Sequence, residues 1–382
     1  MNNSADIVII GGGISGVCAG YFLLKHGAKN VVLLERDYLT SGSTGRCGAG
    51  IRQQWGSEVN CLMTQFSCNF FENAQDELDY PGGIEFHQGG YLLLVYTEKE
   101  LVQTKKNIAL QNSLGINSKL LTPDEAKKIA PLLNTKGLLA AAYYKKDGHL
   151  NPFKTTQAFA DAFVRLGGSI YTNTEVTDIT IEKDKVTGVD TTAGYISTPC
   201  VVNAAGGYTQ DLAKLAGIDL PLYAERHNIL VTEPVAPILS TMVMSFSRNF
   251  YCQQTPHGSF IMGRSCKDQP QDLRVTADSG FPEAMAETIT AVMPRLKNLR
   301  MLRQWAGTYN MSPDKHPVYD KAPGVDGLYI AAGFSGHGFM LGPATGQSIA
   351  EIVLGLSPTL PWDKLGIKRF EEGGLVLEPS VV

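Results

Sequence analysis

Three glycines near the start of the chain, Gly11, Gly13 and Gly16, have the spacing GxGxxG and directly follow the apolar residues 7–10. This spacing predicts a dinucleotide site, because Gly11 allows a tight turn, Gly13 lets the backbone approach a pyrophosphate, and Gly16 lets the next helix pack on the strand. The N-terminus of that helix presents free N–H groups to the phosphates. Glu35 ends a second apolar run about 20 residues later, where a carboxylate can accept hydrogen bonds from ribose hydroxyls. A tight turn without a ligand is the alternative for the glycines alone.

Two further glycine-rich segments, 42–50 and 333–338, are predicted to approach the same ligand. The first contains too many glycines for a regular element. The second follows an apolar strand at 328–332 and precedes a helix from 342 to about 354. A nicotinamide dinucleotide rarely needs both segments, whereas an extended FAD does, so the pattern favours FAD.

The elements that position these segments follow from hydrophobic periodicity. Helical spacing runs from 57 to about 79, and Pro152 opens a helix that reaches about residue 166. Residues 174–190 are predicted to form a hairpin, and 195–207 a single apolar strand that ends in small residues. Short alternating segments between about 220 and 309 predict an antiparallel sheet in a second domain.

Composition limits the function classes. The 382 residues, 43% of them hydrophobic and 18% charged, are typical of a globular protein. The net charge of −4 and the lack of a basic cluster argue against nucleic acid or an anionic membrane as a partner. No apolar run is long enough for a membrane span, and the N-terminus has no basic and apolar leader, so a cytoplasmic protein without direct membrane insertion is expected. The seven cysteines contain no CxxC pair, so neither a disulfide framework nor a metal site is expected.

Three motifs together resemble the D-amino-acid oxidase superfamily of flavoproteins: GGGISG with Glu35, VVNAAGG at 201–207, and AAGFSGHGFMLGPATG at 331–346. The segments STGRCGAGIRQQW and RQWAGTYNMSPDKHPV, at 43–55 and 303–318, most resemble the FAD-bearing β subunits of dye-linked L-proline dehydrogenase and heterotetrameric sarcosine oxidase. The resemblance extends over essentially the whole chain.

The resemblance implies an α/β fold, in which a Rossmann-like FAD-binding domain of the GR2 type is joined to an α+β substrate domain built on an antiparallel sheet. The FAD-binding domain is expected to be discontinuous, at 1–82 with 145–218 and 315–382. The substrate domain is expected at 83–144 with 219–314.

The resemblance also implies that FAD is bound non-covalently. The expected cofactor-binding residues come from the three glycine-rich segments and their neighbours: Gly11, Gly13, Ile14, Ser15, Gly16, Glu35, Arg36, Ser43, Thr44, Arg46, Cys47, Gly48, Ala49, Val176, Ala204, Gly206, Gly307, Gly333, Ser335, Gly336, His337, Gly338, Phe339 and Met340.

Oxidation of an amino acid by flavin requires a cation for the substrate carboxylate, an apolar or aromatic wall, and groups that favour the neutral amine. Arg52 is the first candidate for the cation and Arg46 the alternative, although an arginine at the surface or on a flavin phosphate is the competing explanation. His227, Tyr251, Gln253 and His337 are the other expected active-site residues; a structural histidine or core packing would explain the first two almost as well.

Two departures from the family bear on the electron acceptor. Monomeric sarcosine oxidases carry a lysine that promotes the reaction with oxygen, and residues 259–263 contain none, so oxygen is expected to be a poor acceptor. The histidine that carries FMN in heterotetrameric sarcosine oxidase is also missing, since His149 does not align with it. Any FMN is therefore expected at a subunit interface without a covalent bond.

The sequence therefore predicts oxidation of a small amino acid of the proline, sarcosine or glycine type, by hydride transfer to flavin N5, in a β subunit of a multi-subunit dehydrogenase. An α subunit or another electron-accepting protein is the expected partner. A stand-alone oxidase that uses oxygen, and a flavin scaffold or electron-relay subunit without its own substrate, are the alternatives.

Overall fold

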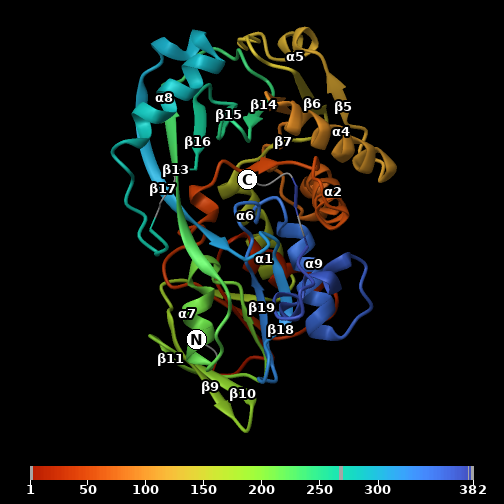
Figure 1. Ribbon diagram of the computed structural model, residues 1–382. Helices are drawn as coiled ribbons and strands as arrows, with labels where there is room; N and C mark the ends of the chain where they lie inside the picture. The colour runs from red at the N-terminus through yellow and green to blue at the C-terminus, as the bar shows by residue number, and fades with distance from the viewer. Residues whose placement is uncertain (1–2, 266–269, 377, 380–382) are drawn as a thin grey trace.

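The structure is a computed structural model that describes residues 3–265, 270–376 and 378–379. A six-stranded sheet forms the centre of the lower half of the molecule in Figure 1. Its order is β18-β19-β12-β1-β2-β8, and all neighbours are parallel except β18 and β19. Because β1 lies between β2 and β12, the chain reverses its order there, and the carboxyl end of β1 is a topological switch point where ligands bind. The strands are β1 (Ile7–Ile10), β2 (Val31–Leu34), β8 (Ser169–Tyr171), β12 (Val201–Asn203), β18 (Val318–Lys321) and β19 (Leu328–Ala332).

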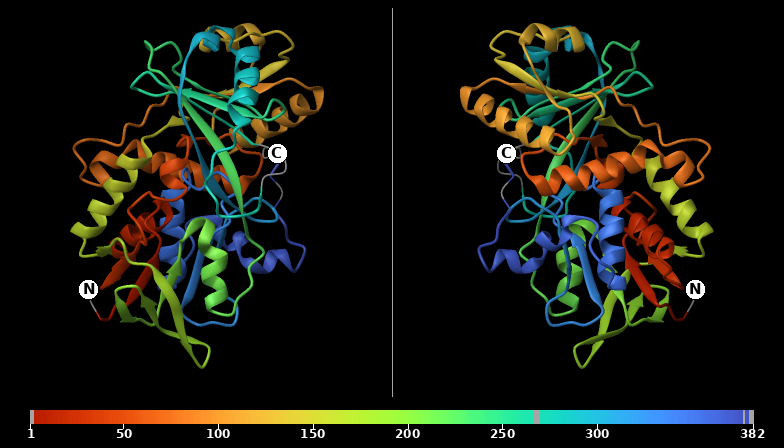
Figure 2. Two further views of the ribbon diagram at one scale, coloured as in Figure 1. Left: turned by 90° about the vertical axis from the view of Figure 1, so that its left-hand side faces the viewer. Right: turned by 90° about the vertical axis from the view of Figure 1, so that its right-hand side faces the viewer.

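Both faces of this sheet are covered, which explains its uninterrupted apolar strands. Ile7 and Ile9 of β1 belong to the core formed with α1 (Ile14–Lys25), α2 (Glu58–Glu72), α6 (Pro152–Arg165) and α9 (Gly342–Leu354). Val8 and Ile10 point to the other face, against the antiparallel strands β9 (Val176–Glu182), β10 (Lys185–Thr191) and β11 (Gly194–Ser197) and helix α7 (Thr209–Leu215). Figure 2 shows α1 and α9 side by side.

An eight-stranded sheet forms the other half, with the order β17-β13-β16-β15-β14-β4-β6-β5. All its pairs are antiparallel except β14 with β4. The long strands β13 and β17 extend from this sheet toward the six-stranded one (Figure 1). The strands are β4 (Tyr91–Val95), β5 (Lys119–Leu121), β6 (Ala140–Tyr144), β13 (Tyr223–Thr232), β14 (Met242–Ser245), β15 (Phe250–Gln254), β16 (Phe260–Arg264) and β17 (Met301–Met311).

The remaining elements connect or cover these sheets. They are the pair β3 (Gly50–Ile51) and β7 (Gly148–His149), and the helices α3 (Ala74–Glu77), α4 (Glu98–Ser113), α5 (Pro123–Ile129) and α8 (Phe281–Val292). Short 3-10 turns occur at Thr44–Arg46, Gly206–Tyr208, Pro294–Asn298, Pro361–Leu365 and Ile367–Phe370.

The predicted fold class is confirmed, with two local corrections. The expected single strand at 195–207 is two strands in different sheets, β11 and β12, because the chain turns at Thr198 and Pro199. Helix α8 interrupts the segment 220–309, for which short strands of an antiparallel sheet were predicted; its buried face, which includes Phe281 and Met285, packs on the eight-stranded sheet. The strands of the two sheets come from different segments of the chain, and the domain boundaries given above stay a prediction.

Candidate active site

One cavity of about 790 Å³ runs from the six-stranded sheet to the eight-stranded sheet. Its wall contains Ile10 at the end of β1, Leu34 at the end of β2, and residues of β13, β14, β15 and β17. The volume is in the usual range for small-molecule and cofactor sites. The switch point of one sheet and the face of the other therefore meet at a single site.

Most of the residues predicted for the cofactor lie in this wall. They are Gly11, Gly13, Ile14, Ser15, Glu35, Arg36, Ser43, Thr44, Arg46, Cys47, Gly48, Ala49, Val176, Ala204, Gly206, Gly307, Ser335, Gly336, His337, Gly338, Phe339 and Met340. Gly16 and Gly333 are outside it. A Cβ on Gly16 would lie 1.9 Å from the carbonyl oxygen of Gly11, so this glycine serves packing, and a Cβ on Gly333 would point at the side chain of Ser312, 3.1 Å away.

The end of the cavity near β1 has the features of a phosphate site. Gly11 has a φ of 116°, and a Cβ there would lie 2.5 Å from the carbonyl oxygen of Ala204, so only glycine fits. Gly13 caps helix α1, whose first turn contains no acidic residue. The N–H of Ile14 donates to Thr44 Oγ1 at 3.1 Å, which fixes the loop 42–50 to the helix N-terminus. An anion beside this helix end would be stabilised by the remaining N–H groups and the helix dipole.

Glu35 is held at the end of β2 with its carboxylate in the wall. Oε2 accepts from the N–H of Gly12 at 2.7 Å, and Oε1 accepts from the N–H of Asp37 at 2.9 Å and from Ser41 Oγ at 3.3 Å. The side chain is only 8% exposed. It is therefore a fixed acceptor, as the interaction with a ribose hydroxyl requires. Next to it, the Arg36 guanidinium lies over the Tyr208 ring, with Cζ 3.9 Å from the ring centroid.

The loop 42–50 is anchored to the eight-stranded sheet. Arg46 donates from Nε to the Ser41 carbonyl at 3.2 Å and from an η nitrogen to the Ala306 carbonyl at 3.3 Å. Trp305 Nε1 donates to the Arg46 carbonyl at 2.9 Å. Gln253 Nε2 donates to the Gly48 carbonyl at 2.7 Å. Gln253 does not line the cavity, so the structure places it behind the loop rather than on the substrate side where it was expected.

Three rings from the strands β17, β13 and β15 form a stack in the wall, and Tyr251 of β15 reaches His227 across Gly263 of the intervening strand β16. His227 on β13 lies between Tyr309, with centroids 4.4 Å apart and planes at 12°, and Tyr251, with centroids 6.0 Å apart and planes at 10°. Burial lowers the pKa of His227 to about 4, so the imidazole is neutral at pH 7. Its Nε2 has no hydrogen-bond partner among the described residues. A buried, neutral and unpaired imidazole nitrogen is available to a ligand.

Arg52 forms a second cluster with Trp55 and His337. Its Cζ lies 3.6 Å from the Trp55 ring centroid, and the His337 ring centroid lies 4.8 Å from the same ring system. An η nitrogen of Arg52 donates to the Gln54 carbonyl at 2.8 Å. The side chain is 4% exposed, and none of the ion pairs in the described part of the chain includes Arg52. Burial lowers the pKa of Arg52 from its ordinary value, although nearby acidic groups oppose this shift.

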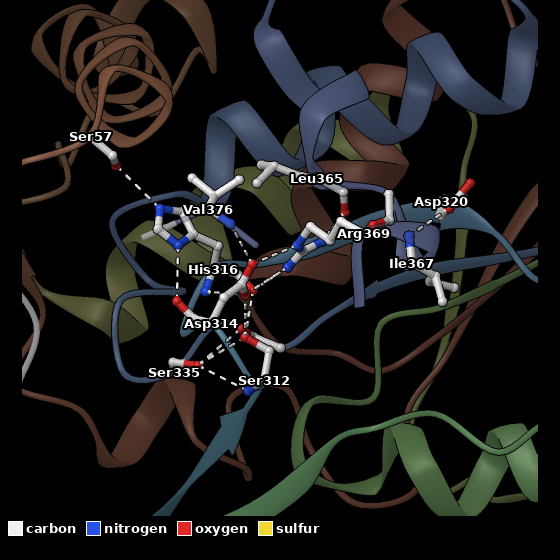
Figure 3. A network of polar contacts seen from close by, with 12 residues as sticks. Ser57, Ser312, Asp314, His316, Asp320, Ser335, Leu365, Ile367, Arg369 and Val376 are labelled. Carbon is white, nitrogen blue, oxygen red and sulfur yellow. Dashed lines mark hydrogen bonds and ion pairs between the residues drawn. The ribbon is translucent and has the colours of Figure 1, made fainter. Parts of the chain in front are cut away.

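A polar network supports the late turn at 333–338 (Figure 3). Arg369 forms an ion pair with Asp314, with Nε 2.7 Å from Oδ2, and both side chains are buried. Ser312 follows β17; its N–H donates to Ser335 Oγ at 3.1 Å and its Oγ to the His316 carbonyl at 2.7 Å. Ser335 lines the cavity. Arg369 also donates to the His316 carbonyl at 3.0 Å, which is the carbonyl that Ser312 binds. The buried ion pair is therefore linked through His316 and Ser312 to the segment that carries this part of the wall.

Sequence reasoning missed several wall residues, among them Trp55, Tyr91, Met242, Phe246, Tyr309 and Asn310. Trp55 and Tyr309 belong to the motifs quoted for the family resemblance, and Tyr309 alternates with Gly307 along one strand, which is a usable signal. Tyr91 and Met242 come from distant segments that carry no local mark of a site.

The wall fits an extended dinucleotide. Besides His227 Nε2, the buried atoms His337 Nε2 and Asn310 Nδ2 have no partner among the described residues, and all three residues line the cavity. Buried polar atoms are normally satisfied, so these three indicate a polar ligand. Burial lowers the pKa of His337 to about 3, so this ring is also neutral at pH 7.

The described residues also bear on metal binding, membrane insertion and the cysteines. No group of three or more His, Cys, Asp or Glu residues there could hold a metal ion. No helix in the described ranges is long and apolar enough to cross a membrane. Six of the cysteines are free, and Cys266 lies outside the described residues.

Comparison with known proteins gives concordant results. The sequence profile of the FAD dependent oxidoreductase family (DAO) matches residues 6–352. Sarcosine oxidase subunit beta of Rhodobacter capsulatus is 29% identical over 379 residues, which are 98% of this chain and 90% of that protein. The crystal structure of L-proline dehydrogenase from P. horikoshii is similar with a TM-score of 0.94 and 37% identity, and covers 98% of this chain and 100% of that one. Glycine oxidase from Geobacillus kaustophilus, at 23% identity and a TM-score of 0.88 over 96% of this chain and 99% of its own, shares the fold.

Proposed function

This chain belongs to the family of FAD-dependent oxidoreductases, and from that premise we propose that it oxidises a small amino acid whose carboxylate binds Arg52. The substrate loses a hydride from the carbon that bears the amine and a proton from the nitrogen, and the resulting imine is hydrolysed by water. Bound FAD supplies the two-electron acceptor for that hydride.

The observation that carries this proposal is the state of Arg52. The guanidinium is buried in the cavity wall and has no ion-pair partner in the described part of the chain. An unpaired buried charge is costly, and proteins retain it where a ligand completes the pair. A carboxylate matches the planar donors of arginine with two parallel hydrogen bonds.

The wall beside Arg52 suits the rest of an amino acid. Phe246 lies 5.5 Å from the Arg52 Cζ, measured to the ring centroid, and Met242, Met244 and Tyr91 line the same cavity. These side chains can pack on a small apolar substituent and exclude water. His227 is neutral at pH 7 because of burial, and its unpaired Nε2 is free to form a hydrogen bond with the substrate amine.

The residues proposed to hold FAD are those of the glycine-rich segments. The N-terminus of α1 with Gly11 and Gly13 would bind the pyrophosphate, Glu35 the ribose, and the loop 42–50 with the turn 333–338 the flavin. The helix α9, which begins at Gly342, contains no acidic residue in its first turn. Its N-terminus would stabilise negative charge on the flavin.

We further propose that the electrons leave through a partner protein. A relative of similar length is a subunit of sarcosine oxidase, which supports a multi-subunit assembly. Residues 259–263, on and before β16, contain no lysine that could promote the reaction with oxygen. FMN at a subunit interface stays a prediction.

Anaerobic reduction of the purified flavoprotein tests the proposal. L-proline, D-proline, hydroxyproline, sarcosine and glycine are added separately, and the flavin absorbance near 450 nm is followed, first without oxygen and then after air is admitted. Bleaching by at least one amino acid with slow recovery in air is the expected result. Fast recovery with peroxide formation would make the protein an oxidase, and absence of bleaching with every amino acid would refute the proposed activity.

A further inference from the structure

The segment that carries Arg52 is held by a carboxylate outside the cavity wall. Asp147 lies in the turn between β6 and β7 and is completely buried. Its Oδ1 accepts from the N–H of Gln53 at 2.9 Å, and its Oδ2 accepts from Gln54 Nε2, also at 2.9 Å. Gln54 Nε2 donates in addition to the Tyr91 carbonyl at 3.0 Å. Asp147 thus fixes both the backbone and the side chain of the residues that follow Arg52.

These contacts lead directly to the Arg52 guanidinium. The carbonyl of Gln54 accepts from Arg52 at 2.8 Å, and Trp55, over which the guanidinium lies, donates from Nε1 to the Arg52 carbonyl at 2.8 Å. The residues 52–55 therefore fold back on themselves, with the guanidinium bonded to the carbonyl of Gln54, the residue whose side chain Asp147 holds. A displacement of Gln54 would displace the acceptor on which the guanidinium depends.

Asp147 is near Arg52 but does not form an ion pair with it. If the two groups were paired, the guanidinium donors would be occupied and a substrate carboxylate would have to displace Asp147. The amides of Gln53 and Gln54 instead satisfy Asp147, which leaves Arg52 its charge and its free donors. In its ionised form Asp147 also supplies a negative counter-charge to Arg52 through space without blocking the cation.

We propose that Asp147 is a positioning residue that acts through Gln53 and Gln54 to hold the Arg52 guanidinium for a carboxylate ligand. This inference rests on the proposed function, since it assigns a role in binding the amino acid. Burial raises the pKa of Asp147 to about 7, while the hydrogen bonds from Gln54 and Gln53 and the charge of Arg52 oppose the shift.

The variant Asp147→Asn keeps the size of the side chain, removes the charge, and places an N–H₂ group against donors that need acceptors. We expect the KM for the amino acid to rise about tenfold or more, with a change in kcat of less than about threefold, because the contact with the substrate carboxylate is made before and during the reaction. In the background of Arg52→Met, the same substitution is expected to change KM by less than about twofold, because the guanidinium through which it acts is absent.

Two controls separate positioning from general stability. Glu351 on α9 is also a buried carboxylate; it accepts from Gln347 Nε2 and from Trp362 Nε1, both at 2.7 Å, and does not line the cavity. Glu351→Gln is expected to lower the denaturation midpoint without changing KM. If Asp147→Asn does not fold, Gln54→Met removes the side-chain link to Asp147 and keeps the Gln54 carbonyl, and KM is expected to rise by a smaller factor.

The outcomes distinguish the two proposals. The positioning role would be overturned if Asp147→Asn raised KM by the same factor in the protein with Arg52 and in the Arg52→Met variant. It would also be overturned if Asp147→Asn left KM unchanged in the protein with Arg52. In both cases the proposed function stands. An unchanged KM in Gln54→Met would have the same meaning. A wild-type flavin that no amino acid reduces would refute the proposed function and, with it, this inference.

Discussion

Replacement of Arg52 by methionine gives the sharpest test of the proposed substrate site. Methionine keeps an unbranched apolar side chain next to Trp55, although it is shorter than arginine, and it removes the charge. Loss of one partner of a buried charge pair costs about 2–5 kcal/mol of binding free energy. A loss of about 3 kcal/mol corresponds to a KM roughly 150-fold higher.

The same substitution, which weakens binding of the amino acid, is not expected to lower the stability of the fold. It removes the hydrogen bond to the Gln54 carbonyl and the cation–π contact with Trp55, worth about 1.5–3 and about 0.5–2 kcal/mol. It also removes a buried cation without an ion-pair partner, whose desolvation costs several kcal/mol. The free energy of unfolding is therefore expected to stay the same or to increase. This is the result expected where a residue is retained for binding although it destabilises the fold.

Both quantities can be measured on the same preparation. Anaerobic flavin bleaching against amino-acid concentration gives KM, and urea unfolding gives the stability. Arg46→Met is the matched control, because Arg46 lies in the same wall but donates to the backbone of Ser41 and Ala306. A KM within twofold of wild type for Arg52→Met would refute the reasoning. A large increase for Arg46→Met instead would assign the carboxylate to Arg46.

Three further predictions concern the cofactor, the buried ion pair and pH. Gly11→Ala should yield protein with little bound flavin, measured as the ratio of absorbance at 450 and 280 nm, because the added Cβ would meet the Ala204 carbonyl oxygen at 2.5 Å; a normal ratio would contradict this role of the turn. Arg369→Met should lower the free energy of unfolding by about 3–5 kcal/mol, since it leaves Asp314 buried without its partner, and urea unfolding that matches the wild type would be evidence against the ion pair. Burial lowers the pKa of His149 from 6.5 to about 4, so the unfolded chain binds a proton there before the folded one does, and His149 by itself should account for a loss of about 3 kcal/mol as the pH decreases from about 6.5 to 4. His227 and His337, whose pKa values burial also lowers, should add to this loss. His149→Gln should therefore make that part of the pH profile less steep, and an equally steep profile would exclude a contribution from His149.

Local sequence was sufficient for the features that depend on adjacent residues. The turn at Gly11 has a conformation that only glycine allows, and Gly13 keeps the start of α1 open to a ligand. In the same way α5 begins with a capping box formed by Thr122 and Glu125, which are three residues apart. The family motifs were sufficient to predict the fold class, because strand, glycine turn and helix recur in a fixed order.

Tertiary structure decided what lies opposite each side chain. Tyr251 and Gln253 are two residues apart on β15 and were both expected in the active site, yet the first lies in the cavity wall and the second donates to the Gly48 carbonyl. The Tyr251–His227–Tyr309 stack joins residues from three strands, and its geometry depends on sheet register.

Arg52 is the clearest example of a residue that the sequence identified but whose environment only the tertiary structure determined. Its position after the glycine-rich loop made it a candidate for the substrate cation, but a sequence cannot tell a buried guanidinium without an ion pair from one that a carboxylate neutralises. The turn that brings Asp147 beside Gln53 and Gln54 is almost a hundred residues further along the chain. The sequence by itself determined the order of elements and the turns that only glycine can form, whereas the electrostatic state of the site depended on which distant side chains the fold brings together, because desolvation and hydrogen bonding act through space.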